Sequence, residues 1–243
     1  GLMDILPVLI LNARPAAGKS EIIDYLHSVS DQVRKDRFHL GKIDEIDDFP
    51  MLWTWFEEDA ILTEMGQPRL HTDKDGFFLF TDLWNLLIRR ICQEYGKKLR
   101  DRPDLHTDTT VIIEFSRGAE HGGYEDAFSH MTGEILKKAA ALYVDVTYEE
   151  SKRKNTRRFN PEKPDSVLEH GLPADKMEIL YKDIDWKDFS SKSPEFLQID
   201  NNAVPYAVLD NSDDITTIGG DRLGERLEIA MNTIWNLSGR GNL

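Results

Sequence analysis

The chain has 243 residues, enough for one large α/β domain or for a core with an inserted subdomain. Its formal net charge of −14 argues against a general nucleic-acid-binding protein, whose phosphate contacts require a basic surface. The single cysteine, Cys92, cannot form an internal disulfide, and no stretch approaches the roughly 18 apolar residues of a membrane-spanning helix. We therefore expect a cytoplasmic protein that binds neither nucleic acid nor a membrane.

The first element along the chain is a candidate phosphate-binding motif. An apolar run over residues 8–11 predicts a buried strand, and apolar residues at positions 22, 23 and 26 predict the helix that follows. The loop between them has alanine where the commonest phosphate loop has its first glycine, and it comprises Ala13, Arg14, Pro15, Ala16, Ala17, Gly18, Lys19 and Ser20. Such a loop points backbone N–H groups at a polyphosphate. Lys19 would reach the β- and γ-phosphates, and the Ser20 hydroxyl would bind Mg²⁺.

The next hundred residues predict one strand and a helical insertion. The first helix is expected to fade over residues 28–31, a strand to span residues 38–46, and Pro50 to close the element before it. Residues 51–108 form an interval too long for a plain connection, so we interpret them as a helical insertion on the acceptor side of the site. Its clearest helix has Thr81 as a candidate cap and an apolar face formed by Trp84, Leu87, Ile88, Ile91 and Tyr95.

The remaining elements alternate between strands and helices. Strands are expected at residues 109–115, 141–146 and 206–210, with a short edge strand at 196–199. Helices are expected at residues 124–140, 148–158, 175–181 and 222–237. This alternation predicts a single three-layer α/β domain over residues 1–243 with a parallel sheet of about five strands. Residues 149–192 are interpreted as a lid followed by an irregular segment.

Charged side chains follow the predicted strands at the edge where parallel sheets bind ligands. Asp47 could accept a hydroxyl proton during phosphoryl transfer while Asp48 positions the acceptor, or this pair could be a helix cap or a solvated turn. Glu114 ends an apolar strand, where an unpaired carboxylate would be costly to bury. It would serve a Mg²⁺ site or form an ion pair with Arg117, which is also a candidate acceptor-binding residue.

A basic cluster follows the strand at residues 141–146. Arg153 and Arg157 lie four residues apart on one helical face, with Arg158 beside them. Guanidinium groups in this place could close over transferring phosphates, or the segment could be a solvated face on which Glu149 and Glu150 pair with the basic residues.

Aromatic residues follow the acidic turn closely. Trp53, Trp55 and Phe56 could form a flat slot for an acceptor ring, although large aromatic residues are more often core. His121, in a glycine-containing turn near the acceptor side, is expected at the surface, and the other histidines show no metal-ligand spacing.

These motifs resemble those of the P-loop kinases that phosphorylate small molecules and nucleotides. The loop at residues 13–20 resembles their Walker A motif, which implies a fold of the P-loop NTPase type. Asp47-Asp48-Phe49 is similar to the Asp-x-Phe-Tyr motif of the uridine kinase and phosphoribulokinase branch, with Pro50 in place of Tyr or His, and this implies that Asp47 is the base.

Two further motifs extend the resemblance. The segment Ile112-Ile113-Glu114 is similar to the acidic strand motif of that branch, with Phe115 where glycine is usual. The three arginines at positions 153, 157 and 158 resemble the lid arginines of nucleoside and nucleoside monophosphate kinases. The resemblance covers about half of the chain, and residues 51–108 and 160–200 match no such pattern.

The combined motifs favour an ATP- and Mg²⁺-dependent phosphotransferase. Its acceptor would be a hydroxyl or phosphate of a small molecule, such as a nucleoside or nucleotide. The alternatives are a regulatory nucleotide-binding protein without transfer activity and an NTPase that drives a partner protein.

Overall fold

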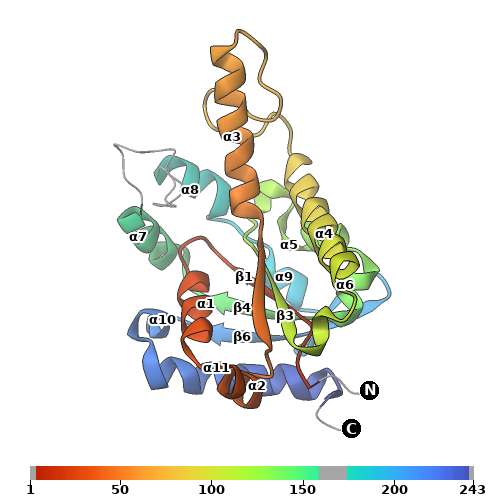
Figure 1. Cartoon of the computed structure of the whole chain (residues 1–243). Helices are drawn as coiled ribbons and strands as arrows, with labels where there is room; N and C mark the ends of the chain where they lie inside the picture. Colours follow the sequence, from red (N-terminus) through yellow and green to blue (C-terminus); the bar gives the residue numbers. More distant parts are fainter. Residues whose placement is uncertain (1–3, 159–173, 241–243) are drawn as a thin grey trace.

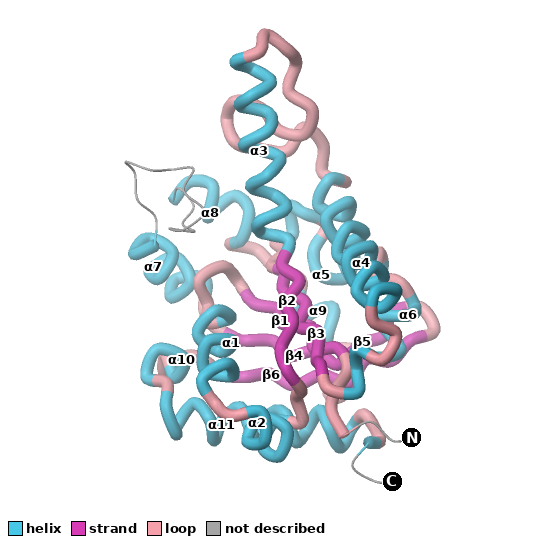
Figure 2. The backbone as a smooth tube through the Cα atoms, in the orientation of Figure 1, coloured by secondary structure: helices cyan, strands magenta, loops and turns pink. Residues whose placement is uncertain are grey.

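The computed structural model describes residues 4–158 and 174–240, and it places β1 (Val8–Ala13) in the middle of a six-stranded sheet. The strand order is β2-β3-β1-β4-β6-β5 (Figure 2). The bounds of the other strands are β2 Lys42–Asp47, β3 Thr109–Phe115, β4 Ala139–Asp145, β5 Phe196–Ile199 and β6 Asn202–Asp210. All neighbouring strands pair in parallel except β5, which is antiparallel to β6.

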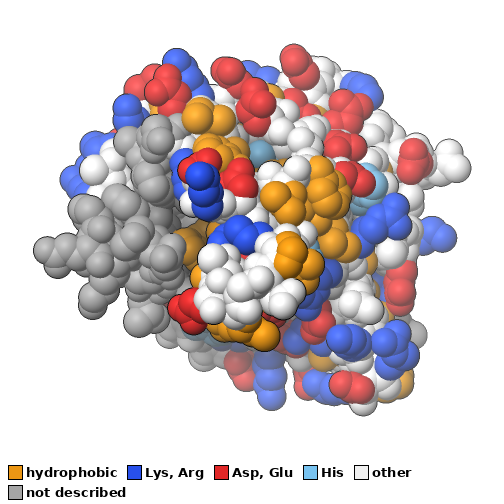
Figure 3. Space-filling model, turned by 90° about the horizontal axis from the view of Figure 1, so that it is seen from above, with side chains coloured by type: hydrophobic (Ala, Val, Ile, Leu, Met, Phe, Trp, Pro, Cys, Tyr) orange, Lys and Arg blue, Asp and Glu red, His pale blue; other side chains and the backbone are white. Residues whose placement is uncertain are grey.

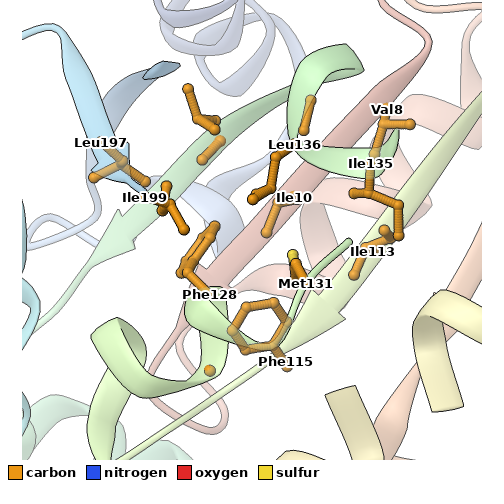
Figure 4. Packing of buried hydrophobic residues seen from close by; sticks show 14 of the residues in the cluster. Val8, Ile10, Ile113, Phe115, Phe128, Met131, Ile135, Leu136, Leu197 and Ile199 are labelled. Carbon is orange, nitrogen blue, oxygen red and sulfur yellow. The ribbon is translucent and has the colours of Figure 1, made fainter. Parts of the chain in front are cut away.

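Helices cover both faces of the sheet (Figure 1). One face carries α1 (Lys19–Ser28), α2 (Asp31–Phe38), α10 (Ile215–Ile218) and α11 (Gly220–Leu237). The other carries α4 (Leu83–Asp101), α5 (Gly123–Ser129), α6 (Gly133–Lys138) and α9 (Trp186–Ser190). Between this second face and its helices lies an apolar core in which residues of β1 and β3 meet Phe128, Met131 and Ile135 (Figure 4). The continuous apolar runs of β1 and β3 are explained by this covering, because both sides of each strand are buried.

The remaining α-helices lie at the carboxyl edge of the sheet. The 17-residue α3 (Asp48–Glu64) continues directly from β2 and projects beyond the sheet (Figure 1). The segment α7 (Tyr148–Arg158) follows β4, and α8 (Ala174–Tyr181) contacts the short 3₁₀ helix Ala119–His121. A second 3₁₀ helix, Leu105–Thr107, precedes β3. No helix in residues 4–158 or 174–240 is long and apolar enough to cross a membrane.

Several predicted elements are confirmed. The strands at 109–115 and 196–199 and the helix at 148–158 have the predicted bounds, and the apolar face of α4 is buried as expected. The parallel part of the sheet has the predicted five strands, and β5 adds an antiparallel sixth at the edge.

Three predictions of local structure are wrong. Residues 31–38 form the helix α2, which was not predicted, and β2 begins at Lys42 rather than at residue 38; the Ser30 side chain caps α2 by accepting from the Val33 N–H at 3.2 Å. Pro50 does not end an element but lies in the first turn of α3, where a missing N–H costs nothing. The predicted helix at 124–140 is divided into α5 and α6, and its last two residues already pair with β1.

The loop between α3 and α4 is held by one buried carboxylate. Asp59 accepts hydrogen bonds from the N–H groups of Leu70, His71 and Thr72, at 3.0, 3.1 and 2.7 Å, and from the Thr72 hydroxyl at 2.6 Å. Burial raises the pKa of Asp59, but these bonds outweigh burial and leave the pKa below its ordinary value. The loop then turns back on itself through a 2.9 Å hydrogen bond from Leu79 N to His71 O.

Candidate active site

The site lies where the chain connections after neighbouring strands leave the sheet in opposite directions. The helix that follows β1 packs on one face, whereas the helices that follow β3 pack on the other. Open α/β sheets bind ligands beyond the carboxyl ends of strands at such a point. The loop after β1 and residues Ser116 and Arg117 after β3 therefore flank the expected crevice.

The loop at residues 13–20 has the backbone of a tight, preorganised turn. Ala16 has φ 57° and Gly18 has φ 116°, so two of its residues lie in the left-handed region. A Cβ atom on Gly18 would lie 2.7 Å from Thr216 Cγ2, so only glycine fits there. Gly18 also precedes the first residue of α1 and has no side chain that could cap the helix.

Side chains from three other elements hold this loop from behind. The Asn211 amide donates to the Ala17 carbonyl at 2.9 Å and accepts from the Thr216 N–H at 3.1 Å. The Tyr124 hydroxyl donates to the Ala13 carbonyl at 3.1 Å, and the Ser151 hydroxyl donates to the Pro15 carbonyl at 2.6 Å. The loop conformation is therefore set by tertiary contacts as well as by its own sequence.

Replacing Asn211 by alanine is expected to loosen the loop. Asn211 is fully buried, so its loss leaves the Ala17 carbonyl and the Thr216 N–H without partners and lowers the free energy of unfolding by about 1–3 kcal/mol. Chemical denaturation measures this change, and titration with ATP measures the accompanying loss of affinity. The matched control, exposed Asn201→Ala, should change neither quantity, and an Asn211→Ala protein as stable as wild type would contradict a structural role for this amide.

The two basic side chains of the loop have different environments. The Lys19 ammonium donates to the Ala13 carbonyl at 3.4 Å and to the Ser116 hydroxyl, so it spans the gap between the ends of β1 and β3. The Arg14 guanidinium instead donates to the carbonyls of Val146, Tyr181 and Lys182, at 2.9, 3.3 and 3.1 Å. Arg14 therefore attaches the end of α8 to the loop, and its contribution to phosphate binding would come from its backbone.

Two carboxylates lie side by side at the ends of β2 and β3, because Asp47 and Glu114 are register partners. Burial, and then the charge of Asp48, raise the pKa of Asp47 to about 6. Burial, and then the charge of Asp47, raise the pKa of Glu114 to about 8. In the described part of the chain no hydrogen bond reaches the Glu114 carboxylate. A bound cation would therefore stabilise the ionised forms of Asp47 and Glu114.

Asp47 also caps α3, as one reading of the acidic turn predicted. Its Oδ1 accepts from the Phe49 N–H at 3.0 Å. Among the described residues no donor reaches its Oδ2, which leaves that oxygen for a proton or a metal ion.

The ion pair between Glu114 and Arg117, one of the two alternatives for Glu114, is not formed. Arg117 donates instead to the Asp48 carboxylate at 2.6 Å and to the carbonyls of Ser116 and Trp84, at 2.7 and 3.1 Å. Only 1% of the Arg117 side chain and 9% of that of Asp48 are exposed. The guanidinium also lies 5.1 Å from the Trp84 ring centroid. This buried pair joins α3, α4 and the end of β3.

A cavity of about 470 Å³ connects the loop, the carboxylates and an aromatic chamber. Pro15, Ala16, Lys19 and Ser20 line it at the loop, and Asp47, Asp48 and Glu114 line it at the strand ends. The chamber is lined by aromatic rings, those of Phe49, Trp53, Phe56, Phe77, Phe78, Phe80, Trp84 and Tyr181. Seen from above, hydrophobic side chains gather in the middle of this face, among acidic and basic ones (Figure 3).

The structure divides the aromatic residues that the sequence grouped together. Trp53 and Phe56 line the cavity, but Trp55 stacks on His71 with ring centroids 4.6 Å apart and belongs to the packing between α3 and α4. His121, expected at the surface, is 1% exposed and lies against Trp84 with ring centroids 3.8 Å apart. The 3₁₀ helix at 119–121 turns the imidazole inward, and Gly118 donates its N–H to Nδ1 at 3.0 Å.

Sequence reasoning missed Ser116, Trp84 and Tyr181 as site residues. Ser116 directly follows β3, so the rule on strand ends could have found it. Trp84 was predicted on the apolar face of its helix, but the local sequence pattern does not distinguish a residue that lines a cavity from one that is packed in the core. Tyr181 comes from a segment whose position only the tertiary structure determines.

The predicted lid arginines belong to α7, and the two whose side chains are described, Arg153 and Arg157, lie outside the cavity. Arg153 is exposed and pairs with Glu150 three residues earlier, as the solvated-face alternative predicted. Arg157 is also exposed, and neither residue is among the described residues that line the cavity. The Arg158 side chain and residues 159–173, which join α7 to α8, lie outside the described part of the chain.

Side-chain oxygens that line the cavity are suitable ligands for Mg²⁺. Ser20 and Glu114 both line the cavity, and hydroxyl and carboxylate oxygens are typical magnesium ligands. Within residues 4–158 and 174–240 no cluster of three or more His, Cys, Asp or Glu side chains has the arrangement of a metal site. A Mg²⁺ ion here would therefore depend on phosphate and water ligands as well, as is usual when it binds with a nucleotide.

Comparisons with known proteins leave the family open. No protein-family model matches the chain, and no curated protein matches its sequence significantly. Among solved structures it is similar to a gluconokinase from Sinorhizobium meliloti 1021, with 11% sequence identity and a TM-score of 0.41, over 98% of this chain and 97% of that one. It is also similar to the crystal structure of APE1195, with 13% identity and a TM-score of 0.36, over 95% of this chain and 99% of that one. These values do not assign the chain to a family.

Proposed function

We propose that the protein is an ATP- and Mg²⁺-dependent phosphotransferase that acts on a hydroxyl group of a small molecule. The single observation that carries the proposal is the continuous cavity that runs from the loop at residues 13–20, past Asp47 and Glu114, into an aromatic chamber. A nucleotide held by the loop would direct its terminal phosphate into a space large enough for a second, organic ligand. A hydrolytic NTPase needs room only for water at that position.

The residues have separate tasks in this proposal. The N–H groups of the loop and Lys19 hold the polyphosphate and neutralise its charge. Asp47 accepts the proton of the acceptor hydroxyl through Oδ2, and its pKa of about 6 suits a base that must be ionised at neutral pH. Ser20 and Glu114 would hold Mg²⁺, which supplies charge neutralisation between the phosphates.

Two further groups complete the proposed site. Arg117 holds the Asp48 side chain in place at the cavity through its 2.6 Å hydrogen bond. The arginines at 153, 157 and 158 would approach the phosphates by a movement of α7, whose Ser151 already contacts the loop through the Pro15 carbonyl.

Replacing Lys19 by alanine is expected to lower the rate of ATP-dependent transfer by a factor on the order of 10²–10³, because one cationic donor to the transferring phosphate is lost. The assay measures ADP release from MgATP in the presence of a panel of hydroxyl compounds. Exposed Lys137→Ala on α6 is the matched control and should leave the rate unchanged.

The same assay separates transfer from the alternatives. Release of ADP that no compound accelerates would favour an NTPase. Binding of ATP with no ADP release under any condition would favour a regulatory nucleotide-binding protein. Either result contradicts the proposed transfer.

A further inference from the structure

The aromatic chamber is a continuous wall of rings that comes from separate parts of the chain. On α3, the Trp53 ring lies 5.8 Å from that of Phe56, which lies 6.1 Å from Phe78 in the following loop. Phe78 then lies 4.4 Å from Trp84 on α4, and His121 stacks on the other side. Asp59 fixes the loop that carries Phe78, as described above. Faces of this kind bind flat, apolar rings better than they bind polyols.

The charges of the cavity disfavour an anionic ligand in this chamber. Four carboxylates line the cavity, those of Asp47, Asp48, Glu114 and Glu120. Of the cationic residues in its wall, Lys19 belongs to the phosphate loop and Arg117 is bound to Asp48. The third, Lys176, lies with Nζ 5.4 Å from the centroid of the Phe77 ring, and it is the cation of the described wall that a second anion could reach. Beside a bound polyphosphate, such an anion would still meet more acidic groups than this one lysine balances, so an uncharged ligand is favoured there.

Two residues of the chamber wall carry buried N–H donors that have no partner among the described residues. In the described part of the chain no acceptor reaches Trp53 Nε1 or His121 Nε2. Because His121 Nδ1 accepts from the Gly118 N–H, the proton of the neutral ring lies on Nε2. Burial, and then the charge of Arg117, lower the pKa of His121 to about 2, so the ring stays neutral at physiological pH. Unpaired buried donors are costly, and an oxygen acceptor on a ligand would satisfy them.

We infer that the acceptor is an uncharged aromatic alcohol that carries a carbonyl or ring acceptor atom, and that monophosphates and carboxylates bind there more weakly. The inference rests on the proposed function and specifies its substrate class. The flat ring would lie among Trp53, Phe78 and Trp84, the hydroxyl would face Asp47, and the acceptor atom would take a hydrogen bond from Trp53 or His121.

Calorimetric titration in the absence of ATP tests this class separately from catalysis. The probes are 4-(hydroxymethyl)benzamide, its anionic counterpart 4-(hydroxymethyl)benzoate, and xylitol, a neutral polyol without a ring. The benzamide is expected to bind at least about tenfold more tightly than either, because the carboxylate would lose its hydration beside acidic groups and xylitol has no aromatic face. Equal or tighter binding of the benzoate or of xylitol, or no binding of the benzamide at millimolar concentration, would overturn the inference.

Variants test the two donors. Benzyl alcohol has the ring and the hydroxyl but not the carbonyl, so the wild type should prefer the benzamide over it. This preference should fall about three- to tenfold in Trp53→Phe or in His121→Phe, since one hydrogen bond is lost. It should be unchanged in Trp55→Phe, which alters the same helix away from the cavity. A preference that survives in both Trp53→Phe and His121→Phe would refute the assignment of these donors.

Failure of this inference is distinguishable from failure of the proposed function. If the benzamide binds as expected but neither it nor any other alcohol accelerates ADP release, the phosphotransferase proposal is wrong while the ligand class holds. If an anionic compound binds more tightly and is phosphorylated, the function holds and the substrate class is wrong.

Discussion

Replacing Glu114 by glutamine is expected to make the ligand-free protein more stable at alkaline pH while lowering its Mg²⁺-dependent activity. The folded-state pKa of Glu114 lies at about 8, against an ordinary value of 4.5. Because folding raises this pKa, the stability that the protonated group contributes is present below about pH 4.5 and is lost as pH rises through about 8. A neutral amide removes this dependence and also relieves the repulsion on Asp47.

Urea denaturation at pH 5 and pH 8.5, without metal or nucleotide, measures the effect. At the higher pH we expect Glu114→Gln to raise the free energy of unfolding by about 2–4 kcal/mol, and at the lower pH by much less. The exposed variant Glu225→Gln on α11 serves as the control and should follow the wild type at both values. A Glu114→Gln protein that is less stable than wild type at pH 8.5 would show that the carboxylate has a favourable partner in the folded state.

The activity of this variant provides an independent readout. If Glu114 holds Mg²⁺, turnover should fall and more Mg²⁺ should be needed for half-maximal rate, even though the protein is more stable. Such a gain in stability with a loss of function is typical of a residue retained for catalysis. Unchanged Mg²⁺ dependence would remove Glu114 from the proposed metal site.

Replacing Arg117 by methionine is expected to lower the free energy of unfolding by about 3–5 kcal/mol, because it leaves the Asp48 carboxylate buried without its cation. The double variant Arg117→Met with Asp48→Asn removes both charges and should recover part of this loss. Denaturation of the wild type, both single variants and the double variant gives the coupling energy between the two side chains.

A surface pair provides the matched control for this prediction. Arg102 and Asp108 form an ion pair at 2.9 Å, but their side chains are 43% and 42% exposed. Arg102→Met should therefore have a far smaller effect than Arg117→Met, since solvent compensates for the lost charge. Equal effects of the two substitutions would contradict the importance of burial at Arg117.

The local sequence pattern was sufficient to predict the strands and helices that have a clear hydrophobic periodicity. The apolar runs of β1 and β3 and the amphipathic face of α4 are decided by short-range periodicity, and they were predicted correctly. The helix α2 was missed because its residues 31–37 are mostly polar, and its start depends on the cap by Ser30. Pro50 was misread because a proline ends a helix in its interior but is tolerated in the first turn.

The sequence by itself determined the strand, loop and helix at residues 8–28, the apolar runs of the sheet and the acidic groups at its strand ends, because each depends on residues a few positions apart. Only the tertiary structure decided that Arg117 binds Asp48 rather than Glu114, that Trp55 lies outside the cavity, and that His121 forms part of the cavity wall. The chamber combines α3, α4, the loop between them, a 3₁₀ helix and α8, which are far apart in sequence. The spacing within any one of these segments carries no information about which others it meets, so the donor half of the proposed site could be predicted from the sequence and the acceptor half could not.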